Sequence, residues 1–312
     1  MSVQDVTSTG TGPTVNGKDL EVVVTDEPGS AAATGELVAP SGKPGWGRSL
    51  LAAFLPPGLV FVAFIGLWYL VSYELLDPDQ REILVPPLHE VLQVGFFNHD
   101  NLFELLGGLW QTTMVAFVGL LIAVAIGLAT AVAMSQARWV ERSLFPYAVV
   151  LQCIPILALV PLIGFWLDFG FSARVVVCVL ISLFPIITNT LFGLQSVEPG
   201  QQDLFTLHGA SRWTRLTKLQ FPAALPAIFT GLRISAGLSV VGAVVGDLFF
   251  KQGENPGIGS LIGLYLNRLL QQQLFAAIIL SSALGVVVFW LFGFIGQRAV
   301  GSWHVTSSRD GR

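Results

Sequence analysis

The stretch HGASRWTRLTKLQFPAALP, His208 to Pro226, interrupts a series of long apolar runs with cations at a helical spacing. Three cations recur every third residue: Arg212, Arg215 and Lys218. A helix would place them close together on its surface, beside the apolar Trp213 and Leu219. Gly209 supplies the left-handed backbone of a tight turn before this helix. The pattern predicts a short two-sided helix with ionic and apolar binding groups.

The predicted helix has a signal at each end. Ser211 can cap its first turn. Pro222 is predicted to end it, because the ring disfavours helical backbone at Phe221 and removes a donor, while Pro226 suits the opening turn of the next helix. A helix lying on anionic lipid headgroups is one interpretation, but it needs neither a glycine turn nor a fixed distance to a proline. The segment therefore favours a rigid element that docks into a groove on a protein.

No residue set predicts catalysis or a bound cofactor. GPTVNGKD, Gly12 to Asp19, nearly matches a phosphate-binding loop, but Asp19 replaces the Mg²⁺-binding hydroxyl and no strand precedes it. All four histidines fall outside the apolar runs: His89, His99, His208 and His304. The runs themselves contain no H-E-x-x-H motif and no paired carboxylates. Cys153 and Cys178 fall inside apolar runs and predict neither a disulfide nor a metal site. We expect no enzyme activity, no metal and no ATP hydrolysis by this chain.

Membrane spans are the elements that must position these residues. The chain is 53% hydrophobic and 12% charged, with a mean hydropathy of +0.70, which is too apolar for a soluble domain. A crossing needs about 20 mostly apolar residues. Six runs reach this length: Leu50 to Tyr73, Met114 to Met134, Tyr147 to Leu167, Val175 to Leu194, Ile228 to Phe249 and Leu274 to Ile295. We predict an all-α, polytopic membrane protein with six transmembrane helices.

The chain ends differ from this membrane domain. Residues 1–45 are dominated by Thr, Gly, Ser, Pro and acidic residues without helical periodicity, which predicts a disordered tail. The start lacks the cationic region and apolar core of a cleavable signal peptide. We therefore predict three parts: a tail over 1–45, a six-helix membrane domain over 46–300 and a short tail over 301–312.

Lys and Arg near the span ends favour both termini in the cytoplasm. With the amino terminus inside, eight cations are cytoplasmic: Lys43, Arg48, Arg138, Arg142, Arg212, Arg215, Lys218 and Arg298. Four are external: Arg81, Arg174, Lys251 and Arg268. The segment 208–226 is then cytoplasmic, between the fourth and fifth spans. Arg233 and Asp247 lie near opposite ends of the fifth span, and both are expected to snorkel to the interfaces.

The segment before the fifth span resembles the cytoplasmic loop of permease subunits of binding-protein-dependent ABC importers. The family pattern is E-A-A-x-x-x-G, nine residues, then I-x-L-P. Its counterparts here are Asp203, Leu204 and Phe205, with Leu and Phe in place of the two alanines, then Gly209, Leu219, Phe221 and Pro222. FPAALPAIFTGLRIS, Phe221 to Ser235, is similar to the family's return into the membrane. LVPPLHEVL, Leu84 to Leu92, is similar to a stretch in nitrate, sulfonate and taurine permeases, so the resemblance extends from about Leu50 to Arg298.

The resemblance implies a coupling helix that docks on a separate ATPase subunit, which uses the ATP. Two ATPase copies would drive a pair of permeases, two copies of this chain or one with a similar partner, between inward-open and outward-open states. An extracytoplasmic solute-binding protein would deliver the cargo. The docking anchors would be Phe205, Leu207 and Trp213, with Arg212 and Arg215 at the rim. The chain would lie in the cell (inner) membrane among lipid, with no nucleic-acid partner.

The spans contain further candidate residues. Four small residues at i, i+4 spacing predict a helix-packing face: Gly119, Ala123, Gly127 and Ala131. Prolines predict kinks in the third and fourth spans: Pro155, Pro161 and Pro185. Uncharged polar residues either hold helices together or line a solute pathway, with Gln152 and Asn189 as the first candidates: Gln111, Thr112, Gln152, Asn189 and Thr190. The stretch Glu254 to Leu266 predicts a re-entrant element over the external mouth or, alternatively, a plain loop.

Other transport classes fit the residues less well. A proton-coupled transporter needs ionisable residues deep in its spans, where only Asp247 comes close. A passive channel gives no reason for the cytoplasmic loop. The subgroup likeness favours a small anion as cargo, such as an aliphatic sulfonate, taurine or nitrate. A pyrimidine or another vitamin precursor is the alternative.

Overall fold

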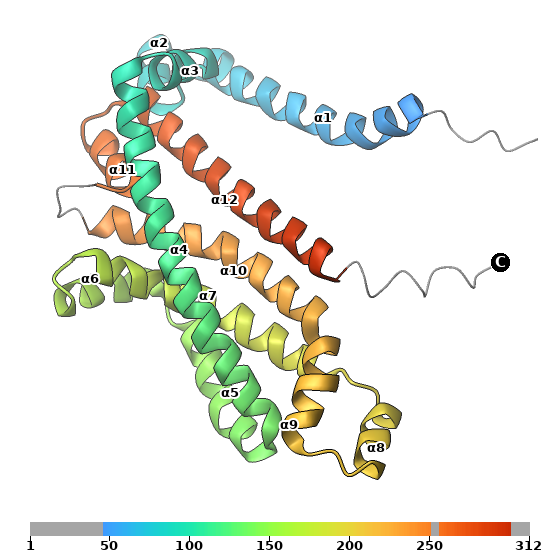
Figure 1. Ribbon diagram of the computed structural model, residues 1–312. Helices are drawn as coiled ribbons and strands as arrows, with labels where there is room; N and C mark the ends of the chain where they lie inside the picture. Colours follow the sequence, from blue (N-terminus) through green and yellow to red (C-terminus); the bar gives the residue numbers. More distant parts are fainter. Residues whose placement is uncertain (1–45, 251–255, 301–312) are drawn as a thin grey trace, which may run out of the picture. The chain divides into compact units, whose positions relative to one another are not determined.

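The computed structural model describes residues 46–250 and 256–300, with side chains from Leu55 onwards (Figure 1). Over these residues the regular elements are all helices, as predicted. The chain divides into two units, Met1–Pro57 and Gly58–Arg312. The first unit contributes only the start of one helix to the described residues, so the packing below is that of the second unit. The predicted tails lie outside the described residues.

Five described helices are long and apolar enough to cross a membrane. They are α1 (Trp46–Leu70), which continues into the π-turn η1 (Val71–Leu75), α4 (His99–Gln136), α7 (Phe171–Gln195), α10 (Phe221–Phe249) and α12 (Gln271–Val300). The third predicted span is instead a pair, α5 (Arg138–Cys153) and α6 (Ile156–Trp166), bent by 97° at the break. The predicted count of six holds when this pair is one span.

Pro155 explains the break between α5 and α6. The ring carries no N–H for the carbonyl of Leu151, and Ile154 before it is extended at φ −68° and ψ 127°. The kink predicted at Pro155 is therefore a break between two helices, whose axes differ in direction by 97°. Pro161 and Pro185 lie inside α6 and α7, which continue past them.

Five shorter helices connect or cover the long ones: α2 (Pro78–Leu84), α3 (Leu88–Phe96), α8 (Pro199–Leu207), α9 (Arg212–Arg215) and α11 (Ile258–Asn267). A π-turn, η2 (Leu216–Gln220), joins α9 to α10. Trp68 at the end of α1 donates from its indole N–H to the carbonyl of Pro86, 3.0 Å away, and its ring lies edge-on to Phe275 of α12. Trp68 therefore connects the segment around Pro86, just before α3, to α12.

Small residues let α4, α7 and α10 approach one another closely; α7 and α10 run side by side, with α4 against α7 (Figure 1). All four small residues of the predicted packing face on α4 are buried. A Cβ on Gly119 would overlap Cys178 of α7, and one on Gly127 would lie 2.7 Å from Ile186 Cγ2. Gly242 of α10 lies against the backbone of Cys178 from the other side. Since apolar burial drives little association in lipid, this close packing is a main source of helix attraction.

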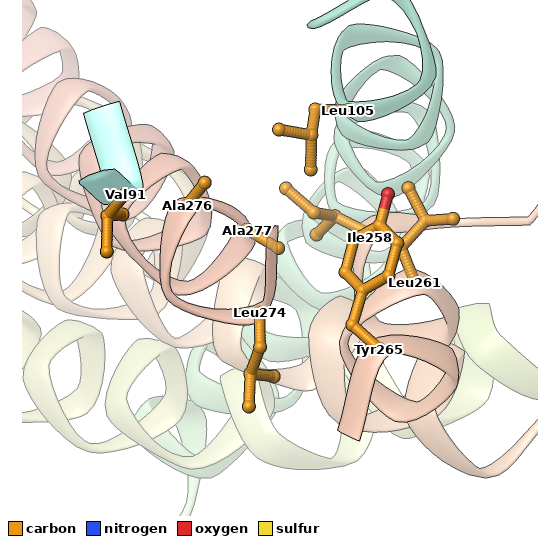
Figure 2. Packing of buried hydrophobic residues seen from close by; sticks show 8 residues of the cluster. All are labelled: Val91, Leu105, Ile258, Leu261, Tyr265, Leu274, Ala276 and Ala277. Carbon is orange, nitrogen blue, oxygen red and sulfur yellow. The ribbon is translucent and has the colours of Figure 1, made fainter. Parts of the chain in front are cut away.

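Helix α11 fills a buried position between α4 and α12. Ile258, Leu261 and Tyr265 are almost fully buried and pack with Leu105 of α4 and Leu274 of α12 (Figure 2). The Tyr265 hydroxyl donates to Glu104 Oε2 over 2.9 Å. The alternative of a plain loop is wrong for these residues, because the apolar positions fall on one helical face that the neighbouring helices cover.

The α4–α7 contact predicts a position-dependent cost of enlarging a glycine. We expect Gly119→Leu to lower the free energy of unfolding by about 2 kcal/mol, because the new side chain overpacks against Cys178. Gly107→Leu on the same helix is the matched control, since no atom lies within 4 Å of its Cβ position. Denaturant unfolding of both variants in one detergent measures the difference. Equal stability of the two variants would show that α4 and α7 are not in close contact at Gly119.

Candidate functional site

Helix α8 ends in a Schellman motif centred on Gly209. The Gly209 N–H donates to the Thr206 carbonyl over 3.0 Å, and the Ala210 N–H donates to the Phe205 carbonyl over 3.0 Å. Gly209 has φ +65°, the left-handed backbone expected from the sequence. No atom lies within 4 Å of its Cβ position. The glycine is therefore required by backbone conformation and not by lack of space.

The helix after this turn begins as predicted. Ser211 has extended backbone, and its hydroxyl accepts a hydrogen bond from the Thr214 N–H over 3.2 Å. Helix α9 then starts at Arg212. Arg212 and Arg215 lie within one helical turn of this cap. The Gly209 turn and the Ser211 cap together therefore fix the direction in which the two side chains leave the helix.

The predicted stop at Pro222 is wrong. Residues Arg212–Phe249 form one continuous helix, and Phe221 is helical at φ −65° and ψ −46°. The Phe221 N–H bonds to the Leu216 carbonyl, five residues back, in the π-turn η2. This wider turn makes room where the Pro222 ring would meet a carbonyl of an ordinary α-helix. Pro222 thus lies in the first turn of α10, and Pro226, expected there, lies inside the helix.

The apolar anchor candidates differ in exposure. Leu207 is 85% exposed and Trp213 is 71% exposed, while Phe205 is partly buried and lines a hollow of about 360 Å³ with Ala210, Thr214 and neighbouring side chains. Together, Leu207 and Trp213 present apolar surface on both sides of the glycine turn.

The remaining loop candidates frame this surface. The exposed ones are Asp203, Arg212 and Phe221, and the partly buried ones are Arg215, Leu219 and Pro222. Arg215 Nη1 donates to Thr206 Oγ1 over 3.4 Å, which links α9 to α8. Leu216 is buried against Leu194 of α7 and Ile228 of α10. The loop is therefore attached to the packed helices by its buried side.

The five pathway candidates do not converge on one site. Gln152 is exposed and lines a cavity of about 430 Å³ at the α5–α6 break, between α7 and α10. Asn189 Nδ2 donates to the Pro185 carbonyl over 2.8 Å within its own helix. Thr112 and Thr190 are fully buried, and Gln111 is partly buried. Among the five, Gln152 is the residue placed on this cavity.

A buried ionic network joins four helices, and the sequence reasoning missed it. Asp247 of α10 is fully buried, with Oδ1 3.2 Å from Arg174 Nη1 of α7. Thr112 of α4 donates from Oγ1 to Asp247 Oδ2 over 2.5 Å and accepts from the Ile258 N–H of α11 over 2.8 Å. The expectation that Asp247 snorkels is wrong, because the carboxylate is paired inside the protein. Arg174, counted as an external cation, is its buried partner.

Two glycines make this network possible. A Cβ on Gly257, at the start of α11, would overlap the Asp247 carboxylate, and one on Gly259 would overlap the Val244 carbonyl. The Ile258 N–H donates to Thr112 Oγ1, and the start of α11 lies directly against the carboxylate, which suits the positive end of a helix. The available sequence signals were opposite charges at the ends of neighbouring spans and the spacing Gly257-Ile258-Gly259. Neither signal indicates that Arg174 pairs with Asp247.

Residues 105–301 match the family model described as binding-protein-dependent transport system inner membrane component. The chain is 32% identical over 246 residues to the formylaminopyrimidine transport permease protein ThiX of Halalkalibacterium halodurans, covering 75% of this chain and 90% of ThiX. It is 28% identical over 182 residues to the putative aliphatic sulfonates transport permease protein SsuC of Bacillus subtilis, covering 58% and 65%.

Among solved structures, the chain is similar in fold to a chain from the MetNI methionine ABC transporter in an inward facing conformation. The TM-score is 0.55 at 18% identity, with 66% of this chain and 98% of that chain covered.

The ionic network predicts strong energetic coupling. Arg174→Met or Asp247→Asn alone is expected to cost about 3 kcal/mol of unfolding free energy, because each disrupts a buried ion pair. The double variant should cost at least about 1 kcal/mol less than the sum of the two. Denaturant unfolding in detergent measures all three, with exposed Arg138→Met as the control. Additive costs would contradict a direct pair.

Proposed function

The chain belongs to the binding-protein-dependent transport system inner membrane components, and from this premise we propose that residues 203–222 couple it to an ATPase. The protein is the multi-pass permease subunit of an ABC importer and is not an enzyme. The observation that carries the proposal is the continuity of Arg212–Phe249 as one helix. A force applied to α9 reaches the membrane-spanning part of α10 without crossing a flexible joint (Figure 1).

The surface chemistry of the loop supports docking on a protein. Trp213 and Leu207 expose most of their apolar surface, and aromatic anchors of this kind dominate protein interfaces when a partner buries them. Arg212 lies beside Trp213 at the capped start of α9 and can form rim contacts. Gly209 and Ser211 hold the anchors in place before binding, which reduces the entropy lost on docking.

The assembly we propose contains two copies of this permease and two ATPase subunits, with an extracytoplasmic binding protein that delivers solute. Two permeases would enclose the solute pathway between them. Each would offer one ATPase subunit its coupling loop, residues 203–222. ATP is bound by the ATPase subunits, and this chain holds no cofactor. Both chain ends lie in the cytoplasm in this arrangement, as the eight-to-four cation distribution favours.

For the cargo we propose a small neutral heterocycle of the formylaminopyrimidine type. ThiX, the more similar of the two relatives above, is named for this cargo. The cavity at the α5–α6 break is within the size range of small-molecule sites, and its lining residues are apolar except for Gln152. An amide can both donate to and accept from a heterocycle. A small anion such as a sulfonate, taurine or nitrate is the second candidate, supported by the likeness to SsuC.

The docking proposal predicts a loss of ATPase binding from one exposed side chain. Trp213→Ala should weaken retention of the ATPase by roughly thirtyfold, because truncating an interface anchor costs about 2 kcal/mol. Titration of the purified ATPase onto the permease in nanodiscs measures the affinity. Unfolding of the isolated permease should change by less than about 0.5 kcal/mol, since the side chain is exposed.

Trp166→Ala is the matched control, because Trp166 is 68% exposed and lies on α6 outside the loop. This variant should retain the ATPase as the unmodified chain does. Equal ATPase affinity for all three proteins would refute docking through Trp213.

The cargo proposal predicts which loaded binding protein stimulates the transporter. ATP hydrolysis by the reconstituted complex should rise with a binding protein loaded with formylaminopyrimidine and not with one loaded with ethanesulfonate. Gln152→Leu should lower import at least about fivefold, because a hydrogen bond to the heterocycle is lost. Gln93→Leu, the same change at an exposed glutamine on α3 that does not line the cavity, is the control and should leave import unchanged. Stimulation by ethanesulfonate alone would favour the anion.

A further inference from the structure

A second cavity, distinct from the one lined by Gln152, lies between α10 and α12 and begins one helical turn after Pro222. It has a volume of about 430 Å³ and is open to the surface. Aromatic and aliphatic side chains form most of its lining, with Arg233, Thr230 and Gln297 as the polar residues. The cavity is thus amphipathic: one cation and two small polar groups within an apolar wall.

Arg233 is held rigidly in this wall. Its guanidinium carbon lies 4.0 Å from the centre of the Phe289 ring, in a cation–π contact. Gly293 of α12 lets the side chain pass, since a Cβ there would lie 3.1 Å from Arg233 Nε. Nε itself is buried and has no hydrogen-bond partner among the described residues. The cation is therefore fixed by an aromatic ring and not by an acceptor.

No carboxylate on either wall of the cavity can neutralise Arg233. Helix α12 contains no acidic residue, and the one acidic residue of α10 is Asp247, fourteen residues further along and paired with Arg174. The ion pair of Arg174 is the one salt bridge within residues 55–250 and 256–300. An uncompensated arginine costs roughly 3 kcal/mol at the centre of a span on insertion scales, and less toward the end of the span, where Arg233 lies. A bound anion would remove this cost.

A second cation lies on α12 outside the lining of the cavity. Arg298 is on the last described turn of α12, one residue from Gln297, with its guanidinium 4.9 Å from the Phe294 ring. Beside the cavity, Trp290 and Phe294 expose large apolar surfaces. The pattern is one cation in the cavity wall and a second nearer the end of α12, with large apolar side chains exposed on the same helix.

We propose that this cavity is a binding site for an anionic phospholipid, whose phosphate pairs with Arg233 and whose acyl chain lies along α12. Basic pockets between spans bind anionic headgroups by this chemistry. The apolar wall adds a contribution that a free anion cannot obtain, because each buried methylene of an acyl chain contributes about 0.8 kcal/mol. The site does not depend on the proposed cargo or on docking of the ATPase.

The test measures lipid binding to the full-length chain in a neutral detergent by native mass spectrometry. The probes are phosphatidylglycerol and phosphatidylcholine with identical acyl chains. The unmodified chain should bind phosphatidylglycerol at least about fivefold more tightly, as expected for one cation near an anionic headgroup. Arg233→Gln should abolish this preference and Arg233→Lys should retain most of it. Arg138→Gln, which removes an exposed cation at the start of α5, should leave the preference unchanged.

Three results would overturn the proposal. The first is an unchanged preference in Arg233→Gln. The second is displacement of phosphatidylglycerol by glycerol phosphate at equal concentration, which would identify a site for a small soluble anion. The third is that Arg233→Gln changes the fraction of dimer but not the amount of lipid bound per chain, which would identify a second copy as the occupant. If Arg233→Gln does not fold, Val300→Trp, which narrows the cavity and keeps the charge, must lower phosphatidylglycerol binding.

Discussion

The buried pair between Asp247 and Arg174 is the interaction on which the packing of α4, α7, α10 and α11 around it depends. Water is absent from a bilayer interior, so each polar group there must find its partner within the protein. The carboxylate meets this requirement with a guanidinium from α7 and a hydroxyl from α4, and that hydroxyl accepts from the Ile258 N–H in the first turn of α11. One side chain thus fixes the relative positions of four helices. The position of α11 follows from it, because Gly257 lies directly against the carboxylate.

The same helix that carries this pair also begins at the coupling loop. Arg212 and Asp247 lie near opposite ends of one continuous helix, and the π-turn preserves that continuity where Pro222 would otherwise break it. Close glycine contacts then join α10 to α7 and α7 to α4. A displacement of α9 by an ATPase would therefore act on the ionic network and on α11 as well as on the loop. The packing supplies a direct mechanical route from one side of the domain to the other.

Much of this arrangement could be predicted from the sequence, because local chemistry determines it. Apolar length located the spans, the small residues of α4 pointed to a buried face, and Gly209 required a left-handed turn whatever surrounds it. The ionic network could not be predicted, since pairing Arg174 with Asp247 depends on which spans are neighbours. The continuity through Pro222 was also missed, because a π-turn has no distinctive residue pattern. The roles proposed for the loop and for Gln152 remain predictions.

The change of direction at Pro155 has a chemical effect on the cavity beside it. In an unbroken helix the carbonyl of Leu151 would receive the N–H of residue 155, but proline has none. Leu151 and Gln152 both line the cavity, so the carbonyl that loses its helical partner belongs to a residue of the cavity wall. Such an acceptor belongs to the backbone and persists through any side-chain replacement at position 151.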